Sequence, residues 1–322
     1  MTEITAERSE ARRRLPGAAD FWRLWLIGLI VFTVRWIEML VFAVFAYQVT
    51  GSAFIVTMLT MLRMLPLALF GAFMGAVADR FDRRRALLVM PVILFAISIA
   101  AMMLAGAGRL EIWHLAVLAF VNGVAWASDN TIRRVMIGDV VGGEGMATAM
   151  ALDTGANNAS RMLGPALGGA LFAAWGAAAP FAASAGLYAV AIGLAIGLHH
   201  RNHVAVKPAL SMFGLITEGL RAVRHNRKLS GIFVVTAIFN IFNWPFLSLI
   251  PVVGKDTFNL EPQGIGVLSS MGGVGAMLGA MALVLVAQPA RYPAIFVGGV
   301  ILFQAMQIAF ALTRNPGWRA CS

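Results

Sequence analysis

The stretch Gly75–Met90 reads GAVADRFDRRRALLVM, and six of its seven residues from Asp79 to Arg85 are charged. Long apolar segments with almost no charge lie on both sides of this cluster. A helix of about 20 apolar residues spans the hydrocarbon core of a bilayer. The charged cluster is therefore predicted to be a turn at a membrane surface, between two spanning helices.

The composition of the whole chain also indicates that lipid is its solvent. Of 322 residues, 60% are hydrophobic and 12% are charged, whereas about 25% are charged in soluble proteins. The net charge is +10, but most lysines and arginines fall on one side of the predicted membrane, as the positive-inside rule expects. We therefore expect an integral, multi-pass plasma (inner) membrane protein with a cytoplasmic N-terminus and no nucleic-acid partner.

Nine apolar segments are long enough to span the bilayer. They are residues 22–49, 53–78, 86–107, 112–137, 146–175, 179–199, 230–253, 263–287 and 293–313. The predicted organisation is a cytoplasmic tail (1–21), a six-helix bundle (22–200), a cytoplasmic linker (201–228), a partial second bundle of three helices (229–313) and a tail (314–322). Apolar residues recur at helical spacing in the linker, which favours an amphipathic helix on the membrane surface or a solvated linker helix.

The charged turn resembles a family signature. Its residues match the loop 2–3 pattern G-x-x-x-D-R-x-G-R-R of the major facilitator superfamily at Gly75, Asp79, Arg80, Arg83 and Arg84, with Asp82 in place of the second glycine. The resemblance implies a conformational latch that holds one transport state and releases in another. The alternative is a positively charged anchor that only fixes topology.

A second motif lies in the fifth predicted span. Gly155, Gly164, Pro165, Gly168 and Gly169 follow the pattern G-x8-G-P-x-x-G-G, which resembles the antiporter signature of exporters in the same superfamily. Neighbouring strings such as NNASRMLGPALGGAL are similar to the enterobactin-exporter-like and macrolide-efflux-like branch. The resemblance implies an all-α membrane protein with the major facilitator fold.

The activity implied is secondary active efflux of a small amphipathic compound, such as a drug or siderophore, in exchange for protons. The expected partners are a small-molecule substrate, protons and the lipid bilayer. No enzyme motif and no nucleotide-binding motif occurs in the sequence, and its His199–His203 cluster lacks a nearby cysteine or carboxylate. We therefore predict no catalytic residue, no cofactor and no metal site.

Ionisable residues at membrane depth are candidates for function. Arg35 and Glu38 lie three residues apart, so they share a helix face and can neutralise each other. Glu38 is the predicted proton carrier, and a purely structural ion pair is the alternative. Asp129 is predicted to pair with Arg133, four residues along.

Two further groups of polar residues are predicted to serve the substrate cavity or to tie helices together. Asp153, Asn157 and Arg161 recur every four residues and form a polar stripe on the fifth span. Asn240, Asn243 and Trp244 combine hydrogen-bonding groups with an aromatic surface in the seventh span.

The number of spans departs from the family pattern. Proteins of the superfamily have twelve spans, and this chain holds a complete first bundle and about three helices of the second. The alternative to a transporter is therefore a truncated, non-transporting membrane protein, or a subunit that needs a partner chain to supply the missing helices.

Overall fold

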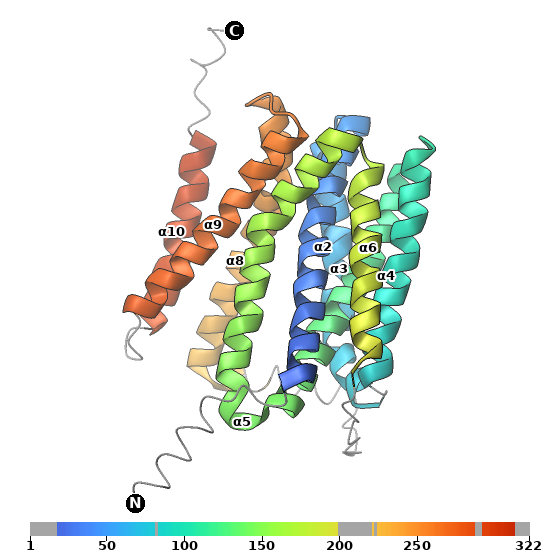
Figure 1. Ribbon diagram of the computed structural model, residues 1–322. Coiled ribbons are helices and arrows are strands. Elements are labelled where there is room, and N and C mark those ends of the chain that lie inside the picture. Colours follow the sequence, from blue (N-terminus) through green and yellow to red (C-terminus); the bar gives the residue numbers. More distant parts are fainter. Residues whose placement is uncertain (1–17, 81–82, 199–220, 222–223, 287–291, 313–322) are drawn as a thin grey trace, which may run out of the picture.

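A computed structural model describes residues 18–80, 83–198, 221, 224–286 and 292–312. Within these ranges every regular element is a helix, and the long helices run side by side (Figure 1). The first described helix begins at one end of the molecule and the last ends at the opposite end. The predicted linker 201–228 and both predicted tails lie largely or wholly outside the described residues.

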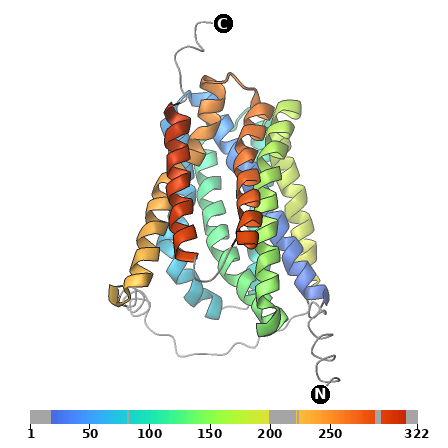
Figure 2. The same cartoon turned by 90° about the vertical axis from the view of Figure 1, so that its left-hand side faces the viewer.

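The helices form two groups along the chain. The first contains α2 (Ala18–Thr50), α3 (Ala53–Arg80), α4 (Arg83–Gly106), α5 (Ile112–Trp175) and α6 (Ala178–Ile196). The second contains α8 (Arg227–Asp256), α9 (Pro262–Val286) and α10 (Tyr292–Leu312). The two groups meet where α9 packs on α5 and where α8 packs on α2 and α3, and Figure 2 shows α9 and α10 from the side.

Helix α5 contains two membrane crossings. Gly142 has φ 70° and ψ 178°, which are not helical values, and this break divides α5 into residues 112–141 and 143–175. A positive φ is readily adopted by glycine because it has no β-carbon. The two halves correspond to the predicted spans 112–137 and 146–175, so the described residues contain one helical segment for each of the nine predicted spans.

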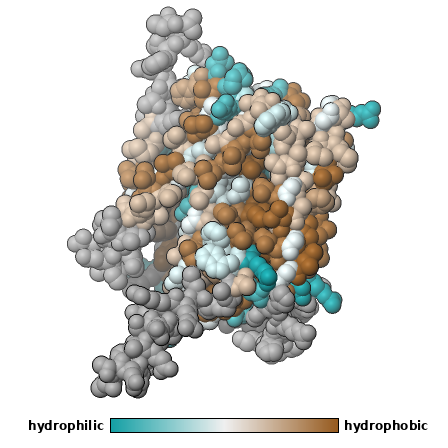
Figure 3. Space-filling view, viewed as in Figure 1, coloured by the Kyte–Doolittle hydropathy of each residue, from teal (hydrophilic) through white to brown (hydrophobic). Residues whose placement is uncertain are grey.

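The outer surface suits a lipid environment. Six described helices are long and apolar enough to cross a membrane, and α3 and α10 contain shorter apolar helices. Large hydrophobic side chains such as Phe54 and Ile241 are 75% and 66% exposed. Hydrophobic residues cover most of the face shown in Figure 3, and hydrophilic residues gather toward its two ends. The chain is a multi-pass membrane protein.

Helix α2 provides the centre of the first group. It packs on α3, α5 and α6 in that group. Its apolar side chains are buried from one end to the other, including Phe21, Leu24, Ile27, Val34 and Val41. This central place explains why polar residues of α2 contact other helices of the chain instead of lipid.

Candidate functional site

A pocket lies between the two helix groups, and the empty space of about 440 Å³ beside its walls includes open solvent. We call this pocket the interface cavity. On one side it is lined by Trp36, Met39, Leu40 and Ala43 of α2, Thr60 of α3, and Arg161 and Pro165 of α5. On the other side it is lined by Leu247, Ser248, Ile250 and Pro251 of α8 and Ser269 of α9. Its walls are mainly apolar with a few polar groups, which is typical of small-molecule sites.

Glycines bring α2 and α5 into close contact beside this cavity. A β-carbon added to Gly164 would lie 2.6 Å from Trp36 Cβ, and one added to Gly168 would lie 3.1 Å from the carbonyl oxygen of Ile37. Atoms cannot approach this closely without displacing one another. Gly164 and Gly168 therefore set the distance between the two helices.

Glycines also bring α5 and α9 together, across the boundary between the groups. A β-carbon on Gly169 would lie 3.0 Å from Gly266 Cα, and one on Gly266 would lie 2.5 Å from the carbonyl oxygen of Pro165. Gly273 is just as close to the backbone of Met162. Gly164, Gly168 and Gly169 of the predicted antiporter segment therefore lie where α2, α5 and α9 cross. Gly155 is the exception, because open space surrounds its β-carbon position.

These contacts lie toward one end of the molecule. The close α5–α9 contacts extend from Gly169 and Pro262, near the ends of these helices, to Met162 and Gly273, near the middle of the second half of α5 and of α9. At this same end Tyr47 Oη donates a hydrogen bond of 2.5 Å to Asp256 Oδ2, joining α2 to α8. The two groups are therefore held together at the end that the positive-inside prediction places outside.

Aromatic rings surround Arg35 near the interface cavity. The guanidinium carbon lies 4.8 Å from the centre of the Trp126 ring and 5.0 Å from that of Phe32. Trp126 in turn meets Trp244 of α8 edge to face at 5.7 Å. Cation–π contacts of this kind hold a guanidinium in place away from water. Arg35 is therefore positioned close to the boundary between the two helix groups.

The predicted polar stripe on α5 runs alongside α2. Asn157 Oδ1 accepts a 2.5 Å hydrogen bond from Arg35 Nη2. The Arg161 guanidinium carbon lies 5.4 Å from the centre of the Trp36 ring. Asp153 instead faces the first half of α5, where it forms an ion pair with Arg133. The three residues therefore contact three different partners, and only Arg161 lines the interface cavity.

A buried ion cluster joins the two halves of α5. Arg133 has no exposed surface; its Nε donates to Asp129 Oδ2 at 3.1 Å, and its Nη1 donates to Asp153 Oδ1. Arg134 Nε adds a weaker contact to Asp153 at 3.4 Å. The predicted Asp129–Arg133 pair is confirmed. Its link to Asp153 was not predicted, because the pairing depends on the chain reversing at Gly142.

The predicted pair between Arg35 and Glu38 is not formed. Glu38 is fully buried, and its Oε1 accepts a 3.3 Å hydrogen bond from Ser98 Oγ of α4, whereas Arg35 turns to α5. Residues three apart on a helix are offset by about 60° around its axis, which is enough for two long side chains to point to different neighbours.

Arg63 of α3 is another buried charged residue in the first helix group. Its Nη2 donates to the backbone oxygen of Arg35 at 3.2 Å, and none of the salt bridges between described residues joins it to Glu38. Glu38 Oε2 and Arg63 Nη1 have no hydrogen-bond partner among the described atoms. The sequence offered no partner for Arg63, and its contact with the α2 backbone depends on how the two helices pack.

The predicted cavity residues of α8 lie off the lining of the interface cavity. Asn240 and Trp244 bond to each other, with Trp244 Nε1 donating to Asn240 Oδ1 at 3.0 Å. Asn243 is buried, and its Oδ1 has no partner among the described atoms. Leu247 and Ser248 line the cavity instead. They lie about one helical turn beyond the predicted residues Asn243 and Trp244.

Two arginines of the predicted latch, Arg83 and Arg84, are described at the opposite end of the molecule. Arg83 Nη1 donates to Asp139 Oδ2 at 2.6 Å, and Arg84 Nη2 donates to the carbonyl oxygen of Ile196 at 2.8 Å. These contacts tie the start of α4 to α5 and α6. Gly75, Asp79 and Arg80 lie in the last turns of α3, and their side chains are outside the described part of the structure.

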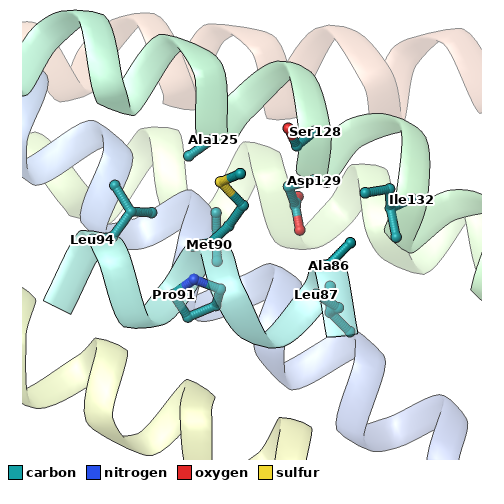
Figure 4. A pocket seen from close by; sticks show the side chains of 10 residues that line it. Ala86, Leu87, Met90, Pro91, Leu94, Ala125, Ser128, Asp129 and Ile132 are labelled. Atoms are coloured by element: carbon teal, nitrogen blue, oxygen red, sulfur yellow. The ribbon is translucent and has the colours of Figure 1, made fainter. Parts of the chain in front are cut away.

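A second pocket lies between α4 and α5, within the first helix group. In Figure 4 the α4 side chains Met90 and Leu94 face Asp129 and Ser128 of α5 across it. The remaining lining is apolar. Asp129 therefore borders this cavity on one side and pairs with Arg133 on the other.

Known proteins resemble the chain over most of its length. The profile of a family described as "Transmembrane secretion effector" matches residues 17–321. Macrolide efflux protein A of Streptococcus pyogenes is 22% identical over 265 residues, which cover 82% of this chain and 65% of that protein. Staphyloferrin A transporter of Staphylococcus aureus is 21% identical over 266 residues, which cover 80% of this chain and 64% of that protein.

The chain thus spans slightly less than two thirds of the length of these relatives. They are transport proteins by name, in agreement with the prediction that the chain is not an enzyme. A crystal structure of D-xylose-proton symporter superposes with a TM-score of 0.57 at 13% identity, over 83% of this chain and 69% of that one. This likeness concerns the fold, and it confirms the predicted fold class.

Proposed function

The chain belongs to the transmembrane secretion effector family of the major facilitator superfamily, and we propose that it exports a small amphipathic compound in exchange for protons. The observation that carries the proposal is the interface cavity. It lies between two helix groups that touch at one end through backbone-to-backbone contacts at glycines. A site between two bundles that rock against each other is the arrangement that alternating access requires.

The α5–α9 crossing is the proposed outer gate. Gly169 and Gly266 allow the two backbones to meet without side chains between them, and the Tyr47–Asp256 hydrogen bond adds one polar tie at that end. Opening outward would break two hydrogen bonds between described residues, Tyr47 to Asp256 and Ala166 N to Ser270 Oγ, together with the close backbone packing at the glycines. Release of the compound at this end is what export requires.

The charged turn from Asp79 to Arg85 lies at the end of the molecule opposite to the proposed outer gate, and we propose that it acts as a latch there. Arg83 and Arg84 hold the start of α4 against α5 and α6. Asp79 is proposed to take part in this latch. Asp79→Asn removes one negative charge and keeps the side-chain shape, so we expect efflux to fall while the amount of protein in the membrane is unchanged.

Glu38 is the proposed proton carrier. It is fully buried, and its Oε1 accepts a hydrogen bond from Ser98 Oγ of α4. A proton on Glu38 would remove its negative charge and supply one O–H donor. Asp153 is a weaker candidate because two arginines already bind its two oxygens.

Efflux assays with the 322-residue chain test this proposal. Cells lacking their own exporters, loaded with naphthalene-ring dyes that carry a carboxylate, an amide or an amine, should retain less of at least one dye when the chain is expressed. A protonophore should abolish the difference. Equal retention with and without the chain, at confirmed membrane abundance, would contradict the proposal.

A matched pair of variants tests the carrier. Glu38→Gln should abolish the gradient-dependent part of efflux and leave dye binding intact, because the amide keeps the shape and cannot exchange a proton at neutral pH. Glu144→Gln, at an exposed position, is the control and should transport normally. Protonophore-sensitive efflux in the Glu38→Gln variant would move the coupling role to another residue.

A further inference from the structure

The interface cavity has an unbalanced charge. Arg161 is the charged residue that lines it, and none of the other described lining residues is acidic or basic. Among the salt bridges between described residues, none involves Arg161. Its guanidinium instead lies 5.4 Å from the centre of the Trp36 ring, which gives orientation without neutralising the charge.

Unsatisfied hydrogen-bond groups lie on both sides of this cavity. Trp36 is 9% exposed, and its Nε1 has no acceptor among the described atoms. The Oγ of Ser269, on the facing helix α9, is also unpaired. A buried N–H group without an acceptor is costly, and an indole nitrogen can only donate. The cavity therefore lacks an acceptor for at least two of its donor groups.

The second arginine near this boundary is not balanced by a carboxylate either. Arg35 donates to the neutral amide oxygen of Asn157 at 2.5 Å. The three buried acidic residues of the first helix group are engaged elsewhere, because Asp129 and Asp153 bind Arg133, and Glu38 accepts a hydrogen bond from Ser98. The described surroundings of the cavity thus carry positive charge and hydrogen-bond donors on an apolar background.

We infer that the interface cavity selects anionic amphiphiles, namely compounds with a carboxylate or similar oxyanion attached to an apolar or aromatic body. The oxyanion accepts hydrogen bonds from Arg161 and from the donors of Trp36 and Ser269. The apolar body packs on Leu40, Leu247 and Ile250. Charge-assisted hydrogen bonds to a guanidinium are stronger than neutral ones. They therefore favour an anionic compound over a neutral compound with the same apolar body. This inference rests on the proposed export function.

Binding of three matched probes to the full chain in lipid nanodiscs tests the inference. The probes share one naphthalene ring and carry a carboxylate, its primary amide or a primary amine, and empty nanodiscs correct for partition into lipid. The carboxylate should bind at least about tenfold more tightly than the amide, since loss of one charge-assisted hydrogen bond has about that effect. The amine should bind most weakly.

Variants assign the preference to the cavity. Arg161→Gln should weaken carboxylate binding by about tenfold or more and leave amide binding within about twofold, whereas Arg161→Lys should retain most of the preference. Arg109→Gln, which removes one exposed positive charge in the loop between α4 and α5, is the control and should bind like the unaltered chain.

Equal binding of the three probes, tighter binding of the amine, or an unchanged preference in Arg161→Gln would overturn the inference. These results would leave export itself standing if the chain still expels the amine in a protonophore-sensitive way. Carboxylate-selective binding by a chain that expels none of the dyes would support the inference and contradict the proposed export.

Discussion

Gly28 of α2 and the guanidinium of Arg133 of α5 occupy adjoining space, and a β-carbon on Gly28 would collide with Arg133 Nη1. The absence of a side chain at residue 28 therefore lets a fully buried arginine lie against α2 while Asp129 and Asp153 bind its other atoms. The Arg133 guanidinium carbon also lies 4.8 Å from the centre of the Phe32 ring. The ion cluster is thus built from both halves of α5 and closed by α2.

We expect Gly28→Ala to destabilise the protein. The added methyl group must displace a guanidinium that is fixed by two carboxylates, and overpacking of this kind costs about 1–3 kcal/mol. Thermal unfolding of the purified chain in detergent should show a lower midpoint for Gly28→Ala. Gly155→Ala is the control, because open space surrounds its β-carbon position. Equal midpoints for both variants would contradict the close packing at Gly28.

The buried ion cluster should be more sensitive to loss of a charge than the exposed pair at the start of α4. Asp153→Asn leaves Arg133 short of one negative partner in a fully buried site, and breaking a buried pair costs roughly 3–5 kcal/mol. Asp139→Asn removes one partner of Arg83 at a site where the Asp139 side chain is 40% exposed, and such pairs contribute about 0–1 kcal/mol. Denaturation of the two variants by the same method gives the comparison, and similar losses would contradict it.

The sequence predicted the elements well because membrane spans depend on length and apolar content, which can be read locally. It predicted 22–49 for α2, which covers Ala18–Thr50, and 86–107 for α4, which covers Arg83–Gly106. It also predicted the Asp129–Arg133 contact, which lies within one helix. Such contacts follow from helical spacing alone.

Contacts between helices were beyond sequence reasoning because they depend on how the helices rotate and cross. Arg35 was expected to contact Glu38 and instead bonds to Asn157, which is 122 residues away. The α8 wall of the interface cavity lies at Leu247 and Ser248 rather than at Asn240 and Asn243. The glycine spacing on α5 indicated close helix packing. It could not predict that Gly169 would pack against Gly266 of α9.

Thiol labelling tests the predicted orientation of the chain. Arg109 and Glu144 are both exposed; Arg109 precedes the first residue of α5, and Glu144 follows the break at Gly142, at the other end of the first half of α5. With Cys321→Ser as the background, a membrane-impermeant maleimide added to intact cells should label Arg109→Cys and should leave Glu144→Cys unlabelled until the membrane is opened. The reverse pattern would place the N-terminus outside and would also move the closed end of the molecule to the cytoplasmic side.

Contact between α5 and α9 at Gly273 is expected to hold the interface cavity shut. A β-carbon there would lie 2.5 Å from Met162 N, a backbone atom that cannot move aside without moving α5. Gly273→Ala should therefore separate the helices, and cysteine at Ser269, which lines the cavity, should react faster with a water-soluble thiol reagent. Each 1.4 kcal/mol of lost closure corresponds to about a tenfold faster reaction if opening limits access.

Gly275→Ala is the matched control for this prediction. It adds the same methyl group two residues further along α9, where no atom lies within 4 Å of the β-carbon position. The reaction rate of the Ser269→Cys thiol should then stay at its starting value, with Cys321→Ser as the background in every case. A similar acceleration in both variants would mean that the glycines act through the flexibility of α9. An unchanged rate in Gly273→Ala would mean that the α5–α9 contact does not control entry to the cavity.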